Sequence, residues 1–244
     1  VNSTCGPVGT SPFYFFSPNH KEIPVHRKFE ACIHAFPFGP DKDQRVFKLK
    51  RPDLWCPPDY KTHFKNDELV FDKPLLIIHN KYNIEHGAIT RNHINLVVLE
   101  KLFIMLQDKY QVVYIRPMGN EKGYSNDCNI LEFEDHNLVK KYSKVILYQD
   151  LLRKYPQYNY NELQLKLHAN CERFITQQSG NNILCCYFGG VNIVLEHIND
   201  KLAGPRFPLS TRDPRGSAYD GYLRDISNQN IVHAKNINEL LDYS

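Results

Sequence analysis

Short apolar runs that alternate with helical patterns after Pro74 place the strongest constraint on the fold of this chain. Residues 75–78 form a continuous apolar run, which is typical of a strand buried on both faces of a sheet. Residues 92–108 then carry apolar side chains at helical spacing. The pattern recurs, with predicted strands at 75–78, 111–116, 145–148, 173–177, 191–195 and 231–233, an extended piece at 130–133, and predicted helices at 92–108, 135–142, 161–171, 183–188 and from 237. This alternation predicts an α/β protein with a Rossmann-like, mostly parallel sheet.

Residues 1–74 have a different composition and hold ten of the fifteen prolines. Proline at this frequency blocks regular helices and central strands. Aromatic residues such as Trp55 are too numerous here for a disordered tail. We therefore expect an irregular, proline- and aromatic-rich N-terminal arm over 1–74, with one short helix near 28–31, packed on a core over 75–244. At this length the core is either one domain or two halves that meet near residue 157.

Charge and cysteine content exclude several classes of protein. The net charge is +3 and no polybasic run occurs, which argues against nucleic acid as the main partner. No apolar segment approaches the roughly 18 residues that a membrane span needs. The seven cysteines form no CxxC pair, which indicates reduced thiols and a cytoplasmic location. The chain begins at Val1 rather than methionine, which is consistent with a removed leader or anchor.

Polar side chains gather where the predicted strands end. In an open parallel sheet, ligands bind beyond the carboxyl ends of the strands. The polar segments at these ends are residues 79–87, Arg116, residues 149–150, residues 177–182 and residues 196–197. Their convergence favours a binding site at that edge.

The stretch 174–190 reads as a strand, a polar turn and a helix. Such a turn directs backbone N–H groups, side-chain amides and the positive end of a helix dipole toward one point, which suits a phosphate or diphosphate. The turn residues are Gln177, Gln178, Ser179, Gly180, Asn181 and Asn182. An ordinary turn in which Ser179 and Asn181 only cap the helix explains the same letters.

Two further groups of residues offer chemistry. Glu85 and His86, in the loop after the first strand, are each suited to general base catalysis, although Glu85 could equally form an ion pair with Lys81. The guanidinium of Arg116 matches the geometry of a diphosphate, and a salt bridge across the cleft is its alternative role. Arg206 and Arg212 lie in a loop rich in Gly, Pro and Arg over 200–230, and would either cover a phosphate or carry surface charge.

Other motifs point away from common cofactors. No GxGxxG follows the first strand and no GxxxxGK[ST] occurs, which disfavours a dinucleotide cofactor and a P-loop. His79, His86 and His93 recur every seven residues but do not share a face, so we expect no metal site there. Asp41-Lys42-Asp43 spells the DxD of metal-dependent glycosyltransferases, yet it lies in the arm rather than after a strand. Asp135 is predicted to cap the following helix.

Several segments resemble glycosyltransferases of large DNA viruses, of the chlorella-virus type. They are residues 75–87 (LLIIHNKYNIEHG), 111–117 (QVVYIRP), 161–171 (NELQLKLHANC), 174–190 (FITQQSGNNILCCYFGG) and 231–241. The resemblance covers about residues 50–244, and residues 174–190 are also similar to the nucleotide-sugar half of GT-B glycosyltransferases. It implies a compact GT-B-like fold and transfer of a sugar, with xylose from UDP-xylose favoured, to a hydroxyl of an N-glycan on a viral glycoprotein in the host-cell cytoplasm. It also implies an inverting reaction without a metal or other cofactor.

The resemblance assigns the base to Glu85, with His86 second, because the family has a tryptophan at the position of His86. The residues and the resemblance together assign donor binding to Lys81, Tyr82, Asn83, Arg116, Gln177, Gln178, Ser179, Gly180, Asn181, Asn182, Arg206 and Arg212. Two alternatives remain. One is a non-catalytic nucleotide- or glycan-binding structural module, and the other is a metal-dependent GT-A enzyme that uses Asp41 and Asp43.

Overall fold

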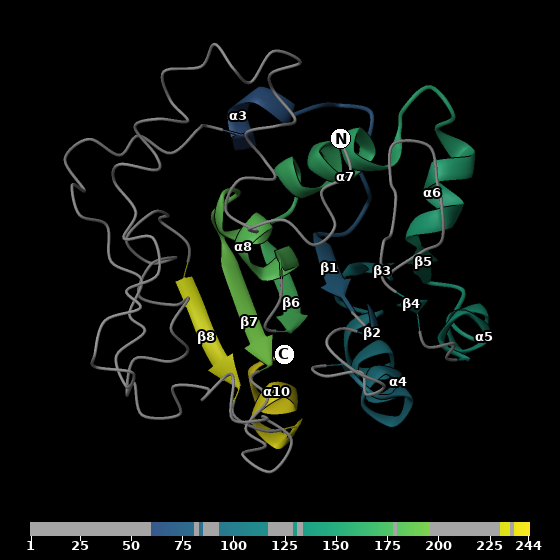
Figure 1. Cartoon of the computed structure of the whole chain (residues 1–244), viewed down its shortest axis with the longest axis vertical. Helices are drawn as coiled ribbons and strands as arrows, with labels where there is room; N and C mark the ends of the chain where they lie inside the picture. The colour runs from purple at the N-terminus through teal and green to yellow at the C-terminus, as the bar shows by residue number, and fades with distance from the viewer. Residues whose placement is uncertain are drawn as a thin grey trace, which may run out of the picture.

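Six parallel strands form the central sheet of this computed structural model (Figure 1). The structure describes residues 60–80, 83–84, 93–116, 129–130, 134–177, 180–195, 230–234 and 237–244. The strands of the sheet are β1 (Leu75–His79), β3 (Gln111–Ile115), β5 (Val145–Leu147), β6 (Arg173–Gln177), β7 (Val191–Leu195) and β8 (Asn230–Ala234). Two further strands, β2 (Asn83–Ile84) and β4 (Asn129–Ile130), pair antiparallel with each other.

The order of strands across the sheet is β5-β3-β1-β6-β7-β8. In chain order these are the third, second, first, fourth, fifth and sixth strands, which is the doubly wound order of dinucleotide-binding folds. The predicted Rossmann-like α/β fold with a mostly parallel sheet is therefore confirmed. The order reverses between β1 and β6, and this reversal is the topological switch point of the sheet.

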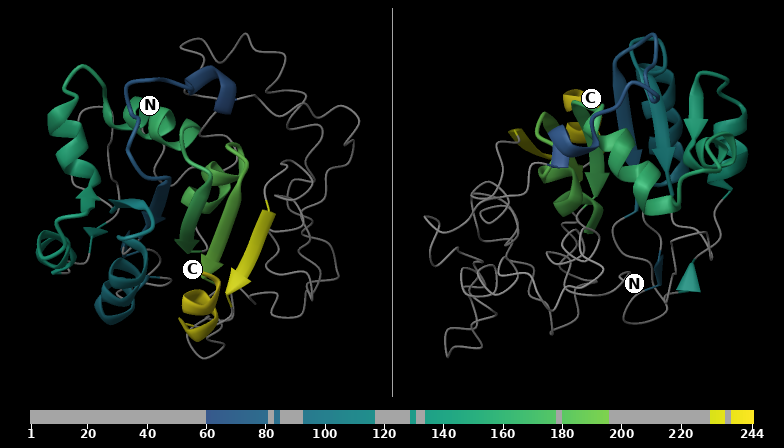
Figure 2. Two further views of the ribbon diagram at one scale, coloured as in Figure 1. Left: turned by 180° about the vertical axis from the view of Figure 1, so that it is seen from behind. Right: turned by 90° about the horizontal axis from the view of Figure 1, so that it is seen from above.

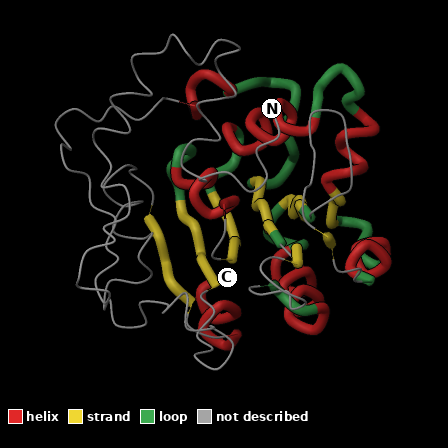
Figure 3. The backbone as a smooth tube through the Cα atoms, in the orientation of Figure 1, coloured by secondary structure: helices red, strands yellow, loops and turns green. Residues whose placement is uncertain are grey.

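Helices cover both faces of the sheet (Figures 1, 2 and 3). One face carries α4 (Leu96–Leu106), α5 (Asp135–Lys140) and α10 (Ile237–Tyr243). The other carries α3 (Tyr60–Phe64), α6 (Tyr148–Lys154), α7 (Tyr160–Ala169) and α8 (Gly180–Cys186).

The strands are apolar because both of their faces are buried. Ile78 of β1 packs in the cluster that contains Leu102 of α4, whereas Ile77 packs in the cluster that contains Leu167 of α7. Alternate residues of one strand thus enter two separate cores. All five residues of β1 are buried, which confirms the prediction for residues 75–78 and adds His79 to the buried strand.

The structure corrects the predicted extent of the strand at 145–148. β5 ends at Leu147, and Tyr148, which was predicted to belong to this strand, begins the undetected helix α6. The predicted irregular arm contains α3, whose Tyr60 is buried in the core cluster that includes Leu163 of α7. The sheet draws strands from both sides of residue 157. The helix predicted near 28–31 lies outside the described residues, and the division into arm and core stays a prediction.

Within the part of the chain that the structure describes, no helix combines the length and the hydropathy that crossing a bilayer requires.

Candidate functional site

The carboxyl ends of β3, β1 and β6 lie side by side at the switch point. The register pairs His79 of β1 with Ile115 of β3, and Ile78 of β1 with Ile175 of β6. The loop after β1, residue Arg116 after β3 and the turn after β6 therefore leave the sheet from three neighbouring strands. This is the position at which open α/β sheets bind their ligands.

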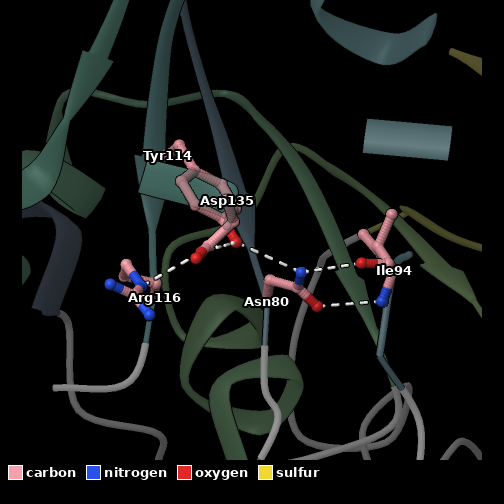
Figure 4. Close-up of polar contacts among 5 residues, drawn as sticks. All are labelled: Asn80, Ile94, Tyr114, Arg116 and Asp135. Carbon is pink, nitrogen blue, oxygen red and sulfur yellow. Dashed lines mark hydrogen bonds and ion pairs between the residues drawn. The ribbon is translucent and has the colours of Figure 1, made fainter. Parts of the chain in front are cut away.

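Asn80, the residue after β1, closes the following segment at its base. Its side-chain amide donates to the Ile94 carbonyl at 2.9 Å, and its Oδ1 accepts from the Ile94 N–H at 2.9 Å (Figure 4). Its own backbone N–H donates to the Ile115 carbonyl at 2.9 Å. Because Asn80 is 2% exposed, these bonds are shielded from water. Segment 81–93 therefore begins and ends at one fixed point on the sheet edge.

A buried chain of polar groups continues from Asn80 to Arg116 (Figure 4). The Asn80 amide donates to the Tyr114 hydroxyl at 3.1 Å, and that hydroxyl donates to Asp135 Oδ2 at 2.8 Å. Arg116 Nε lies 3.0 Å from the same oxygen, with its side chain 14% exposed. Charge-assisted bonds of this kind orient a guanidinium strongly. The buried carboxylate thus fixes Arg116 at the carboxyl edge of the sheet.

Asp135 differs from its predicted role as a helix cap. The N-cap of α5 is Glu134, which makes no side-chain capping bond, and Asp135 is the first helical residue. Its carboxylate is 1% exposed and binds Tyr114 and Arg116 instead. The ion pair that we considered as the alternative role of Arg116 is therefore present. Binding of a diphosphate by Arg116 stays a prediction.

A second buried polar chain holds α8 against the sheet. Thr176 of β6 donates to Asn192 Oδ1 of β7 at 2.9 Å, and the Asn192 amide donates to Asn182 Oδ1 of α8 at 2.8 Å. The side chain of Asn182 thus binds within the protein, and Gln177 is also fully buried. Asn181 is half-buried, and α8 begins at Gly180 rather than at residue 183. Donor binding by these residues stays a prediction.

A third polar cluster lies under β1 and was not predicted. His79 Nε2 lies 2.8 Å from His168 Nε2 of α7, and His168 Nδ1 lies 2.6 Å from the Gln164 carbonyl oxygen. Burial lowers the pKa of His79 well below its usual value, and the neighbouring His168 lowers it further. Burial also lowers the pKa of His168 to about 4, against the opposing effect of the Gln164 carbonyl. Both imidazoles are therefore neutral at pH 7.

The sequence held only a weak signal for this cluster. His79 was visible as a polar residue after an apolar run, but its partner lies 89 residues away on a predicted helix. The seven-residue spacing relates His79 to His86 and His93, and it gives no indication of His168 as a partner.

Of the remaining predicted site residues, the structure describes Asn83 but not the others. Asn83 belongs to β2 and pairs with Ile130 of β4. The residues outside the described ranges are Lys81, Tyr82, Glu85, His86, Gln178, Ser179, Arg206, Arg212, Asp41 and Asp43. Their roles stay predictions.

Comparisons with known proteins find similarity at the level of structure only. No protein-family profile matches the sequence, and no curated protein matches it. Among solved structures, the glycosyl transferase family 9 protein from Veillonella parvula DSM 2008 superposes with a TM-score of 0.38 and 13% sequence identity. The match covers 80% of this chain and 44% of that protein, so this chain spans less than half of that protein's length.

Proposed function

We propose that this chain is a glycosyltransferase that moves a sugar from a nucleotide-sugar donor to a hydroxyl group of a glycan. The observation that carries the proposal is the position of Arg116. It is held by the buried Asp135 at the end of β3, one strand away from the switch point, and beside the closed base of segment 81–93. A fixed cation at that edge is suited to a diphosphate group, which is the leaving group of a nucleotide sugar.

The donor half of the proposed site lies between Arg116 and the turn after β6. As the bond between sugar and diphosphate breaks, negative charge grows on the leaving phosphate oxygen, and fixed positive groups lower the energy of that state. Arg116 supplies such a group, together with the backbone N–H groups of residues 178–182. This arrangement needs no metal ion for the transfer step.

The acceptor half of the proposed site is the loop after β1. Glu85 removes the proton from the acceptor hydroxyl, whose oxygen attacks the anomeric carbon while the diphosphate leaves from the opposite face. His86 is the second choice for this base. The reaction is inverting, because it is a single displacement. UDP-xylose as donor and an N-glycan of a viral glycoprotein as acceptor are supported by the sequence resemblance alone.

Ligand binding tests the donor half. Thermal-shift measurements with uridine, UDP, UDP-xylose and other nucleotide sugars are expected to show stabilisation by the diphosphates, about 2.7 kcal/mol at 100 times Kd. The variant Arg116→Gln is expected to weaken the binding of UDP far more than the binding of uridine. Tyr114→Phe, which disturbs the same polar chain but keeps the cation, serves as the matched control. If Arg116→Gln lowers the affinities for UDP and for uridine by the same factor, a contact between Arg116 and the diphosphate is contradicted.

Transfer assays test the catalytic half. Glu85→Gln is expected to abolish transfer while it preserves donor binding, and Glu172→Gln, an exposed glutamate paired with Lys61, serves as the control. Full activity in Glu85→Gln would remove this residue as the base. Donor binding without transfer from any donor of the panel would instead favour a non-catalytic binding module. Loss of transfer in EDTA would favour the metal-dependent alternative with Asp41 and Asp43.

A further inference from the structure

Three side chains that commonly bind metals meet in the core beneath the switch point. His79 comes from the end of β1, His168 from α7 and Cys185 from α8, and all three are completely buried. Within the described residues their ligand atoms lie within 4.8 Å of one another. The rings of Phe174 and Phe188 lie 5.4 and 5.3 Å from the His168 ring, so the surroundings are apolar.

Hydrogen bonding fixes the orientation of His168. Its Nδ1 lies 2.6 Å from the Gln164 carbonyl oxygen, which can only accept, so Nδ1 carries the proton. The lone pair on Nε2 therefore points toward His79 Nε2, 2.8 Å away. In proteins, metal-bound imidazoles are held in the same way, with the far ring nitrogen donating to a carbonyl or carboxylate.

We propose that His79, His168 and Cys185 form a binding site for a soft monovalent metal ion, Cu(I). A thiolate and two imidazoles are ligands that suit this ion. On binding, Cys185 releases its thiol proton to solvent, and the proton on His79 Nε2 moves to Nδ1, which frees the ligand lone pair. The two ring nitrogens separate to admit the ion between them.

Charge balance selects a monovalent ion over a divalent one. Cu(I), one thiolate and two neutral imidazoles sum to zero, whereas Zn²⁺ with the same three ligands leaves one positive charge in an aromatic core. An uncompensated buried charge is strongly unfavourable. The site takes no part in the proposed sugar transfer, and the outcome of a test of one proposal does not affect the other.

Competition for Cu(I) tests the site. The full chain is titrated anaerobically with Cu(I) against the chelator bathocuproine disulfonate, and metal content and affinity are measured. We expect one tightly held Cu(I) per chain, with an X-ray absorption spectrum that requires two nitrogen ligands and one sulfur. Cys185→Ala and His168→Phe are expected to lower the affinity at least ~100-fold. Cys171→Ala, which removes another buried thiol, is expected to keep the wild-type affinity.

Several outcomes would overturn the proposal. One is a wild-type chain that holds no Cu(I) against the chelator, which would leave the histidine pair as a hydrogen bond only. Others are a Cys185→Ala variant that keeps wild-type affinity, or a spectrum with sulfur ligands alone. Circular dichroism verifies that each variant is folded. If His168→Phe does not fold, the proposal is still tested by the affinity of Cys185→Ala for Cu(I) and by the X-ray absorption spectrum of the wild-type chain.

Discussion

Replacing Asn80 with alanine removes the side chain that closes segment 81–93. The wild-type carboxamide satisfies both the N–H and the carbonyl of Ile94, a residue that is 2% exposed. Each buried backbone group that loses its partner costs about 1–3 kcal/mol. The Tyr114 hydroxyl keeps its bond to Asp135 and adds little to the loss. Asn80→Ala is therefore expected to lower the free energy of unfolding by about 2–6 kcal/mol.

Urea unfolding followed by far-UV circular dichroism measures this change. The midpoint is expected to fall while the m-value stays constant, because the surface exposed on unfolding is unchanged. For a chain of this length the melting temperature drops by about 2–4 °C for each kcal/mol. Asn95→Ala is the matched control, since Asn95 only caps α4, accepting from the Val98 N–H at 3.0 Å, and its loss costs about 1 kcal/mol.

The comparison of Asn80→Ala with Asn95→Ala tests whether the Asn80 carboxamide closes segment 81–93. If Asn80→Ala costs no more than Asn95→Ala, the closure of segment 81–93 does not depend on the carboxamide. Asn80→Asp sharpens the test because it keeps the shape but places a second oxygen against the Ile94 carbonyl. A destabilisation as large as that of Asn80→Ala is expected at pH 7. If Asn80→Asp instead has the same free energy of unfolding as the wild type, the donor role of the amide is refuted.

Three further changes are expected to have measurable effects. Asp135→Asn removes the charge from the bonds to Tyr114 and Arg116, and urea unfolding is expected to show a loss of about 2–3 kcal/mol. Gly189→Ala and Gly190→Ala each place a side chain at positive φ, which costs about 1–2 kcal/mol. Only the Gly190 methyl group would also lie 2.3 Å from the Glu172 carbonyl oxygen, so equal melting temperatures for the two variants would contradict the structure. Burial raises the pKa of Cys171 from 9.0 to about 12, so its contribution to stability is complete below pH 9 and is lost as the pH rises toward 12. By about pH 10.5 the loss is about 2 kcal/mol, and Cys171→Ala is expected to flatten that part of the urea-midpoint curve.

Strands that are buried on both faces were the most predictable part of the fold. β6 and β7 begin and end at the predicted residues, because each carries consecutive apolar residues at its centre and is bounded by polar turns. α6 was missed because no turn residue separates it from β5, so Tyr148 reads as a continuation of the strand. The order of strands in the sheet was not predictable from their alternation, which is the same whether the chain turns back at β1 or continues in one direction.

The polar chains of the site depend on which face each side chain occupies after folding. Tyr114 was predicted to be a strand residue and Asp135 a cap, and nothing in their spacing indicates that hydroxyl and carboxylate meet at 2.8 Å. Arg116 was predictable as a strand-end cation because its place follows from β3 alone. The residue that orients it comes from α5, packed on the sheet through tertiary contacts that no local pattern records.

Consecutive residues fix the end of β1 from both faces of the sheet. His79 is bonded to His168 of α7, and Asn80 is bonded to Ile94 on the side of α4. Side chains alternate across a strand, so neither bond can replace the other. Burying these polar groups costs desolvation that apolar side chains in the same places would avoid, so directional bonding rather than overall stability is what they contribute. The proposed catalytic base, Glu85, belongs to the segment that follows this strand end, and small displacements of a catalytic group sharply reduce rate. Asn80 and Ile94, the described residues on either side of segment 81–93, are therefore held together at the sheet edge by directional bonds.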